Sequence, residues 1–323
     1  MTPRENLLEV INWGKPEYVP IANEFYICGM GVTELVEQPR VRSGKDPYGV
    51  DWIVTSAGPM HDTTKPPLLK DIADWKSVVR IPDIDQIDFE GMAEAEMAKV
   101  DRSRVLVAYF HSCGVFERLV AFMGFENALI ALAEDPDSCM EFFEAITDYK
   151  IKVANRIIDA YKPDVYVYFD DVASARNLFI SPETYRRVIK PFHARTAKAV
   201  IGRGLIYSQH TCGKCEALLE DYVEIGAKIW HAAQIMNDLP GIQRRFKGRL
   251  VIEGGWDSSG RPGHIDASEE EVRAEVRRAM SEYGKNGGFI LMPVMFNEKG
   301  NSLIAGDPRM AAVLDEWNKC RYY

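Results

Sequence analysis

The sequence lacks the features that mark membrane proteins, disulfide-stabilised proteins and nucleic-acid-binding proteins. Nowhere do about 18 apolar residues run together, and the N-terminus has no uninterrupted apolar segment after its first basic residue. The 6 cysteines are dispersed over 323 residues, which is too few for a disulfide scaffold in a chain of this length. The net charge is -9, and Lys and Arg are scattered instead of forming one basic patch. We therefore expect a cytoplasmic protein with reduced thiols that binds small molecules or proteins, with no membrane and no nucleic acid among its partners.

Linkers, low-complexity segments and short repeats are also missing, which favours a single domain. Short apolar runs alternate with stretches of helical periodicity, at residues 18–27, 104–110, 165–169, 205–209, 228–232, 249–253 and 288–292. Continuous apolar runs are typical of parallel strands that are covered on both faces. Val50 to Ser56 supplies an eighth candidate strand. Eight strand–helix repeats without a linker predict an α/β fold, with residues 1–323 forming a single (β/α)8 TIM barrel and not a doubly wound sheet.

Polar residues follow the predicted strands, at the end where TIM barrels carry their active sites. We expect five of them to shape a substrate pocket: Asn23, Glu24, Tyr26, Gln234 and Asn297. We expect His111 to line this pocket as a catalytic residue. Aromatic residues at strand ends are expected to make the pocket tolerant of an aromatic ligand: Phe25, Tyr26, Trp256 and Phe296.

Asp170 and Asp171 directly follow the apolar run VYVYF. Two adjacent acids are costly at a strand end unless they face solvent, a substrate or a cation. We expect one of them to point into the cavity, as a hydrogen-bond acceptor or a general base. Capping of a neighbouring helix is the alternative role.

The stretch SQHTCGKC, residues 208–215, places a histidine and two cysteines close together. A structural zinc site built on Cys-x-x-Cys needs a second ligand pair, which the chain lacks, and a redox dithiol is typical of a smaller fold. A third interpretation separates the cysteines. His210 and Cys212 then point to the same side of a strand end and share a metal, whereas Cys215 packs as a small hydrophobe. A hydrogen-bonded histidine beside a buried thiol is the alternative without metal.

Several segments resemble the uroporphyrinogen decarboxylase superfamily, and within it the corrinoid-dependent methyltransferase branch: NLLEVINWGKPEYVPI, DPYGVDW, GVFERLVAFMGFENALIALAEDPD, YFDDVASARNLFISPETYRRVIKPF, HTCGKCEALLEDYVEIGAKIW and GGFILMPV. The resemblance extends over nearly the whole chain and implies a TIM barrel. True uroporphyrinogen decarboxylases carry an Arg-rich loop after the first strand, which grips substrate carboxylates. The corresponding stretch here, NEFYICGM, contains no Arg, so the methyltransferase branch fits better.

Methyltransferases of this branch use zinc to activate a thiol that accepts a methyl group or an ether that loses one, and the other partner is cobalamin on a small corrinoid protein. The resemblance implies His210 and Cys212 as zinc ligands. In the coenzyme M enzymes a cysteine after the eighth strand follows; here Met295 stands near that position, and a thioether is a poor ligand for zinc. Ether-cleaving relatives place ligands differently, and by their pattern Glu183 and Glu253 stand near the ligand regions. We expect Glu253 to complete the metal site.

The resemblance thus implies a methyltransferase, and we expect it to demethylate a small methoxylated aromatic substrate. It would pass the methyl group to cob(I)alamin on a corrinoid protein, with zinc or an acid activating the ether oxygen. Asp170, Asp171 and His111 are the expected catalytic residues. Two alternatives stay open: a metal-free decarboxylase similar to uroporphyrinogen decarboxylase, and a non-enzymatic protein that binds a corrinoid or a tetrapyrrole.

Overall fold

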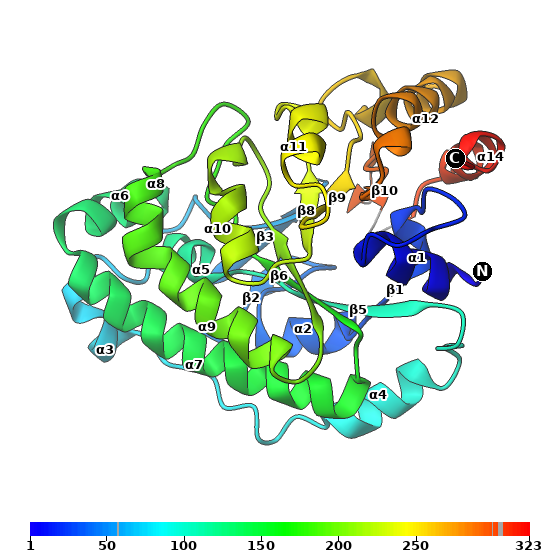
Figure 1. Cartoon of the computed structure of the whole chain (residues 1–323). Coiled ribbons are helices and arrows are strands. Elements are labelled where there is room, and N and C mark those ends of the chain that lie inside the picture. Colours follow the sequence, from blue (N-terminus) through cyan, green and yellow to red (C-terminus); the bar gives the residue numbers. More distant parts are fainter. Residues whose placement is uncertain (57, 299, 303–305) are drawn as a thin grey trace.

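A curled sheet of seven parallel strands forms the centre of the molecule in the computed structural model, which describes residues 1–56, 58–298, 300–302 and 306–323 (Figure 1). The strand order is β1-β5-β6-β7-β8-β9-β10. The strands are β1 (Phe25–Cys28), β5 (Leu106–His111), β6 (Val165–Phe169), β7 (Ile206–His210), β8 (Ile229–Ala233), β9 (Val251–Gly254) and β10 (Phe289–Leu291). Each of the seven predicted apolar runs overlaps one of these strands, so those strand assignments are confirmed.

The two edges of this sheet approach each other just before β1. Ile21 forms a parallel bridge with Leu291 of β10, and the Leu291 amide donates a hydrogen bond of 2.9 Å to the Pro20 carbonyl. The segment that leads into β1 therefore pairs with β10 at Ile21, and β1 itself pairs with β5. The result is a curled parallel sheet resembling a TIM barrel, built from seven named strands.

The prediction of an eighth barrel strand at Val50 to Ser56 is wrong. These residues form β3 (Asp51–Thr55), which lies in a separate antiparallel sheet with β2 (Gly44–Lys45) and β4 (Gly58–His61). Only two residues separate β3 from β4, and so short a connection joins antiparallel strands, whereas parallel barrel strands need a longer crossover. The sequence pattern identified a strand correctly but could not show which sheet it joins.

Helices cover the outer face of the sheet, with α4 (Phe89–Met97), α7 (Pro136–Tyr161) and α9 (Lys190–Ile201) running beside one another (Figure 1). A further two-stranded sheet pairs β11 (Phe296–Asn297) with β12 (Gly300–Asn301). No described helix is both long enough and apolar enough to cross a bilayer. The helices are α1 (Pro3–Ile11), α2 (Met30–Val36), α3 (Trp75–Val78), α4 (Phe89–Met97), α5 (Val115–Met123), α6 (Phe125–Glu134), α7 (Pro136–Tyr161), α8 (Pro182–Thr184), α9 (Lys190–Ile201), α10 (Leu219–Glu224), α11 (Leu239–Arg245), α12 (Glu269–Tyr283) and α14 (Met310–Cys320).

Alternation along the strands separates two buried layers. Odd positions of β6, β8 and β9 and even positions of β5 and β7 point to the inside of the curled sheet, where α1 contributes Leu7, Val10 and Ile11 to the same apolar cluster. The intervening positions, such as Tyr109 and Trp230, pack outward against the helices. Because side chains on a strand alternate between faces, a shift of one residue decides whether a polar group reaches the interior or the helical layer.

Candidate functional site

A cavity of about 260 Å³ lies at the carboxyl ends of the central strands. Its polar lining residues come from several loops and strand ends: Gln38, Arg40, Ser112, Glu117, Asp171, His210, Cys212, His231, Gln234 and Ser258. Its aromatic lining residues are Phe110, Phe169, Trp256 and Phe296. The wall therefore combines flat apolar rings with a few convergent polar groups, which is typical of a site for a small molecule.

The loop after β7 is held by hydrogen bonds to the loops on both sides of it. The Cys212 amide donates to Asp171 Oδ1 at 2.7 Å, and the Gly213 amide donates to Gln234 Oε1 at 2.6 Å. Gly213 has a φ of +88°, and a Cβ atom there would lie 2.5 Å from the Ser174 carbonyl oxygen. Glycine is required here both for the left-handed backbone and for the close approach. This turn directs Cys212 back toward His210.

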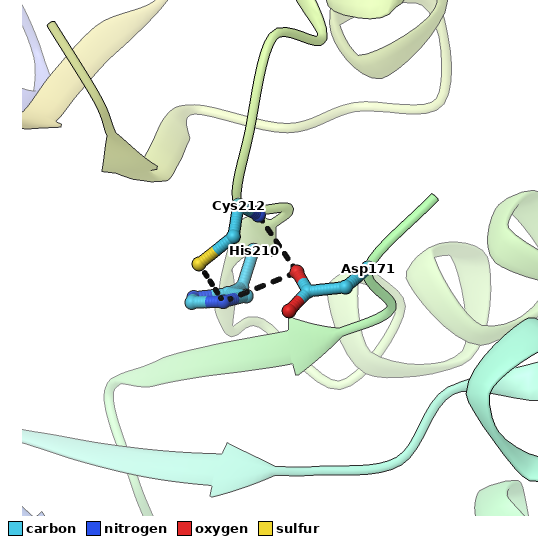
Figure 2. Close-up of side chains that lie close together, drawn as sticks. All are labelled: Asp171, His210 and Cys212. Atoms are coloured by element: carbon cyan, nitrogen blue, oxygen red, sulfur yellow. Dashed lines mark hydrogen bonds and ion pairs between the residues drawn. The ribbon is translucent and has the colours of Figure 1, made fainter. Parts of the chain in front are cut away.

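Asp171, His210 and Cys212 bring three potential metal-ligand atoms within 4.8 Å of one another (Figure 2). Cys212 Sγ lies 3.4 Å from His210 Nε2, and Asp171 Oδ1 lies 3.5 Å from the same nitrogen. All three residues line the cavity. Burial raises the pKa of Cys212 well above its usual value, and the neighbouring Asp171 raises it further. Burial opposes ionisation of Asp171 as well, but His210 and the Cys212 amide hold the pKa of Asp171 below its usual value.

The His210 ring is fixed from two directions. It stacks on Phe169, with ring centroids 3.8 Å apart and planes 15° apart, and its Nδ1 lies 2.5 Å from Nδ1 of His231. Burial, followed by the proximity of His210, lowers the pKa of His231 well below its usual value, so His231 is neutral. The contact between the two Nδ1 atoms leaves Nε2 of His210 directed at Cys212 and Asp171. Such a hydrogen bond to the far ring nitrogen is how proteins orient a metal-binding histidine.

The two adjacent aspartates have separate environments. Asp170 is fully buried, accepts hydrogen bonds from the amides of Phe116 and Glu117 at 3.1 and 3.0 Å, and lies 2.7 Å from Nε2 of His193. It caps the start of α5 and does not line the cavity. Asp171 lines the cavity. The structure thus divides the two expected roles, with capping at Asp170 and the cavity position at Asp171.

Glu117 adds a carboxyl group to the cavity wall. Burial raises its pKa well above the usual value for Glu, and the nearby carboxylates of Asp171 and Asp170 raise it further. Its Oε2 accepts a hydrogen bond from the Gly114 amide at 3.2 Å. Glu117 therefore holds its proton more strongly than an ordinary glutamate, and its protonated form can donate a proton or a hydrogen bond into the cavity.

Of the five residues predicted to bind substrate, Gln234 lines the cavity and the other four do not. Asn23 is exposed. The Glu24 carboxylate accepts a hydrogen bond of 2.7 Å from Tyr18, and the Tyr26 hydroxyl points to Glu96 at 3.4 Å. Asn297 donates to the Gly306 carbonyl at 2.9 Å and to Asp307 at 3.1 Å. Among the predicted aromatic residues, Trp256 and Phe296 line the cavity, whereas Phe25 and Tyr26 do not.

His111 lies on the outer face of β5, and this position corrects the expectation that it lines the pocket. Its Nε2 lies 2.8 Å from Glu37 Oε1, and its Nδ1 contacts the Tyr166 hydroxyl. Glu37 also accepts hydrogen bonds from Arg118 and Lys150, each at 2.8 Å. All of these side chains are fully buried. Burial lowers the pKa of His111 to about 4, so His111 is neutral within this buried charged cluster.

The expected third ligand, Glu253, lies outside the Asp171, His210 and Cys212 cluster. It sits on β9, in register with His231 of β8, and Asp171 occupies the place beside His210 and Cys212 instead. Glu183 lies in α8 and is exposed. Met295 is fully buried in the outer core, and its neighbours Val294 and Phe296 line the cavity. Met295 itself does not line the cavity.

The pKa of Glu253 leads to a prediction about the pH dependence of stability. Burial raises this pKa from its usual value of 4.5 to about 8. Between these pH values Glu253 holds a proton in the folded chain and has released it in the unfolded chain. The free energy of unfolding therefore decreases as the pH rises. We expect Glu253→Gln to leave the unfolding free energy nearly unchanged near pH 4.5. Near pH 8 the variant should be more stable than the parent by up to about 4 kcal/mol.

Urea unfolding at the two pH values, followed by circular dichroism, measures this difference. Glu94→Gln, at an exposed position of α4, is the control and should show no pH-dependent gain. A Glu253→Gln variant whose stability follows the parent at both pH values would mean that Glu253 is ionised in the folded protein.

Several cavity residues were given no role from the sequence, among them Arg40, Glu117 and His231. His231 carries a usable signal, because it stands two positions after Ile229 and so shares the inner face of β8. Glu117 follows a helix start, and nothing in its sequence context indicates a buried acid. Arg40 lies in a loop far from any strand end in the sequence, and only the folded chain brings it to the cavity.

Comparisons with known proteins agree with this architecture. The family model described as Uroporphyrinogen decarboxylase (URO-D) matches residues 60–294. The fold is similar to that of a solved methyltransferase from Methanosarcina mazei, with a TM-score of 0.69 and 15% sequence identity, covering 99% of this chain and 99% of that chain. No curated protein sequence matches. At such low identity the structural likeness concerns the fold alone.

Proposed function

This chain belongs to the uroporphyrinogen decarboxylase family, and from its cavity we propose that it is a zinc-dependent methyltransferase that works with a corrinoid protein. It removes the methyl group from a small methoxylated aromatic compound and passes it to cob(I)alamin on that partner. The observation that carries the proposal is the convergence of Asp171, His210 and Cys212 on one point of a small aromatic cavity. The fold that this chain shares with a solved methyltransferase adds support.

The donor set fits zinc. Imidazole nitrogen, thiolate sulfur and carboxylate oxygen are its usual protein ligands, and catalytic zinc sites keep three of them with one position open for substrate. Asp171, His210 and Cys212 offer one atom of each kind, and all three line the cavity, where a substrate oxygen can approach. Zinc bound there would supply Lewis acidity to the ether oxygen. Cys212 would give up its proton on binding the metal, because the thiolate is the ligand form.

The remaining residues suit the demethylation of an aryl ether. The C–O bond must break so that its electron pair stays on the phenolate oxygen, while the methyl group goes to cob(I)alamin, a two-electron nucleophile. Glu117, whose pKa is raised by burial and by the nearby carboxylates, can donate a proton to that oxygen as negative charge develops. Phe110, Phe169 and Trp256 can pack against the aromatic ring and hold the methyl group in line with its acceptor.

The size of the cavity argues against a tetrapyrrole ligand. Its volume of about 260 Å³ lies just below the range of roughly 300–1,000 Å³ that is usual for pockets of drug-sized ligands. A tetrapyrrole with several carboxylates would also need several cations, and Arg40 is the one Lys or Arg among the described residues that line the cavity. Both observations favour a small substrate.

Methyl transfer to free cob(I)alamin tests the proposal directly. The purified protein, loaded with zinc, is mixed with anaerobically reduced cobalamin and a panel of methoxybenzenes, and the loss of the cob(I)alamin absorbance is recorded. We expect protein-dependent methyl transfer that stops after zinc is removed with a chelator and returns when zinc is added back. Metal-free protein that transfers methyl groups at the full rate would contradict the zinc part of the proposal. Decarboxylation of an acidic substrate, without any methyl transfer, would contradict the proposed methyltransferase function as a whole.

A further inference from the structure

Arg40 is a buried cation in the cavity wall without a partner. It lines the cavity, it is 8% exposed, and its Nε atom has no hydrogen-bond partner. Within the described part of the chain, no carboxylate forms an ion pair with its guanidinium. Buried arginines are almost always paired, because removing a charge from water without compensation is costly.

The backbone on either side of Arg40 is tightly held. Glu34 Oε1 accepts hydrogen bonds from the amides of Arg40 and Val41, each at 2.8 Å. Three residues earlier, Glu37 is anchored in the buried charged cluster by Arg118 and by Lys150. The fold therefore fixes the loop that carries Arg40, and keeps the unpaired guanidinium at the cavity instead of releasing it to solvent.

The two nearest acids, Glu34 and Glu117, interact with Arg40 electrostatically but form no ion pair with it among the described residues. Glu34 is engaged with the backbone amides described above. Glu117 is close enough to interact electrostatically with Arg40 and with Asp171, but among the described residues it forms no ion pair with the Arg40 guanidinium. The cavity wall thus carries a buried guanidinium at Arg40 that is not ion-paired within the described residues, in the same cavity as Asp171, His210 and Cys212.

We propose that Arg40 binds an anionic group, a carboxylate or a sulfonate, on the small substrate whose methyl group reacts beside His210 and Cys212. This inference rests on the proposed function for the identity of the reaction, and adds that the substrate is an organic acid. A guanidinium matches the geometry of a carboxylate with two parallel hydrogen bonds and also accepts the oxygens of a sulfonate. A methoxylated aromatic ring with one acid group has the size that this cavity accommodates.

Ligand binding measured by calorimetry, without cobalamin, tests Arg40 separately from methyl transfer. The probes are 4-methoxybenzoate, 4-methoxybenzenesulfonate and the neutral 4-methoxybenzyl alcohol, and the proteins are the parent, Arg40→Gln and Arg42→Gln. Arg42 is exposed on the same loop and serves as the matched control. We expect Arg40→Gln to weaken binding of the preferred acid roughly 10- to 100-fold and to leave the alcohol unchanged. Arg42→Gln should bind like the parent. The acid that the parent binds more tightly shows whether the preferred anionic group is a carboxylate or a sulfonate.

Two outcomes would overturn the inference: equal binding of both acids by the parent and by Arg40→Gln, or no binding of either acid to the parent. Methyl transfer from the neutral ether that persists in Arg40→Gln, together with equal acid binding, would leave the proposed function standing while the inference falls. Acid binding that depends on Arg40, without methyl transfer to cobalamin, would support the inference and contradict the proposed function. Thermal unfolding checks the variant, and its midpoint should equal or exceed that of the parent because an unpaired buried charge has been removed.

Discussion

The double substitution His210→Ala with Cys212→Ser is expected to lower methyl transfer to cob(I)alamin by at least about 1,000-fold. The same variant should lose the bound zinc, because one ligand is removed and a second is replaced by a hydroxyl, which binds zinc poorly. Asp171 alone would remain of the three donor residues. Metal content by atomic emission and single-turnover kinetics measure the two effects on the same samples.

Cys215→Ala is the matched control for this experiment. Cys215 lies three residues after Cys212, is fully buried, and contacts the Thr211 carbonyl at 3.7 Å, outside the cavity. We expect Cys215→Ala to keep both its zinc and its rate. Zinc loss in the Cys215 variant, or full activity in the double variant, would contradict the assignment of the metal site.

Glu37→Gln is expected to reduce the free energy of unfolding by roughly 3–5 kcal/mol, as is usual when one partner is removed from a buried ion pair. The substitution leaves Lys150 without its carboxylate partner in a fully buried position, and leaves Arg118 with Asp46 as its remaining acid. Chemical denaturation at neutral pH measures the loss. Because Glu37 also anchors the loop of Arg40, acid binding should weaken in the same variant.

The pH dependence of this loss follows from the pKa of Glu37, which is lowered to about 2. Burial by itself would raise it, but Lys150, His111 and Arg118 together outweigh that effect. Since the folded pKa lies below the unfolded value of 4.5, the stabilisation is fully present above about pH 4.5 and is lost as the pH falls toward 2. Glu90→Gln is the control, since the Glu90 partner of Arg156 is 63% exposed. A surface pair of this kind contributes little, so an equal effect of both substitutions would show that the buried cluster is not a major source of stability.

The separate roles of Cys212 and Cys215 could be predicted from the local sequence pattern. The spacing of His210 and Cys212 at the end of a strand predicted that they point the same way, and the structure brings Cys212 Sγ to 3.4 Å from His210 Nε2. Cys215 is buried in the core as predicted. These relations depend on neighbouring positions of one strand and one turn, and local backbone geometry is enough to determine them.

His111 shows where local pattern fails. It shares the His-x-Cys spacing with His210, yet it lies on the outer face of β5, and His210 lies on the inner face of β7. The two apolar runs differ in which alternate positions face inward, and a one-residue difference in register moves a side chain to the opposite face. When both faces of a strand are apolar, its sequence does not show to within one residue where the strand ends.

The sequence by itself determined the seven parallel strands, the polar character of their carboxyl ends and the His210 and Cys212 pair, because these follow from hydrophobic periodicity and short spacings. Only the tertiary structure decided that Asp171, and not Glu253, stands beside that pair. It also decided that Glu37 neutralises Lys150 from 113 residues away, and that Arg40 faces the cavity unpaired. Such contacts depend on strand register and on loop closure across the whole chain, where burial selects the partner of each charge, and no local pattern contains that information.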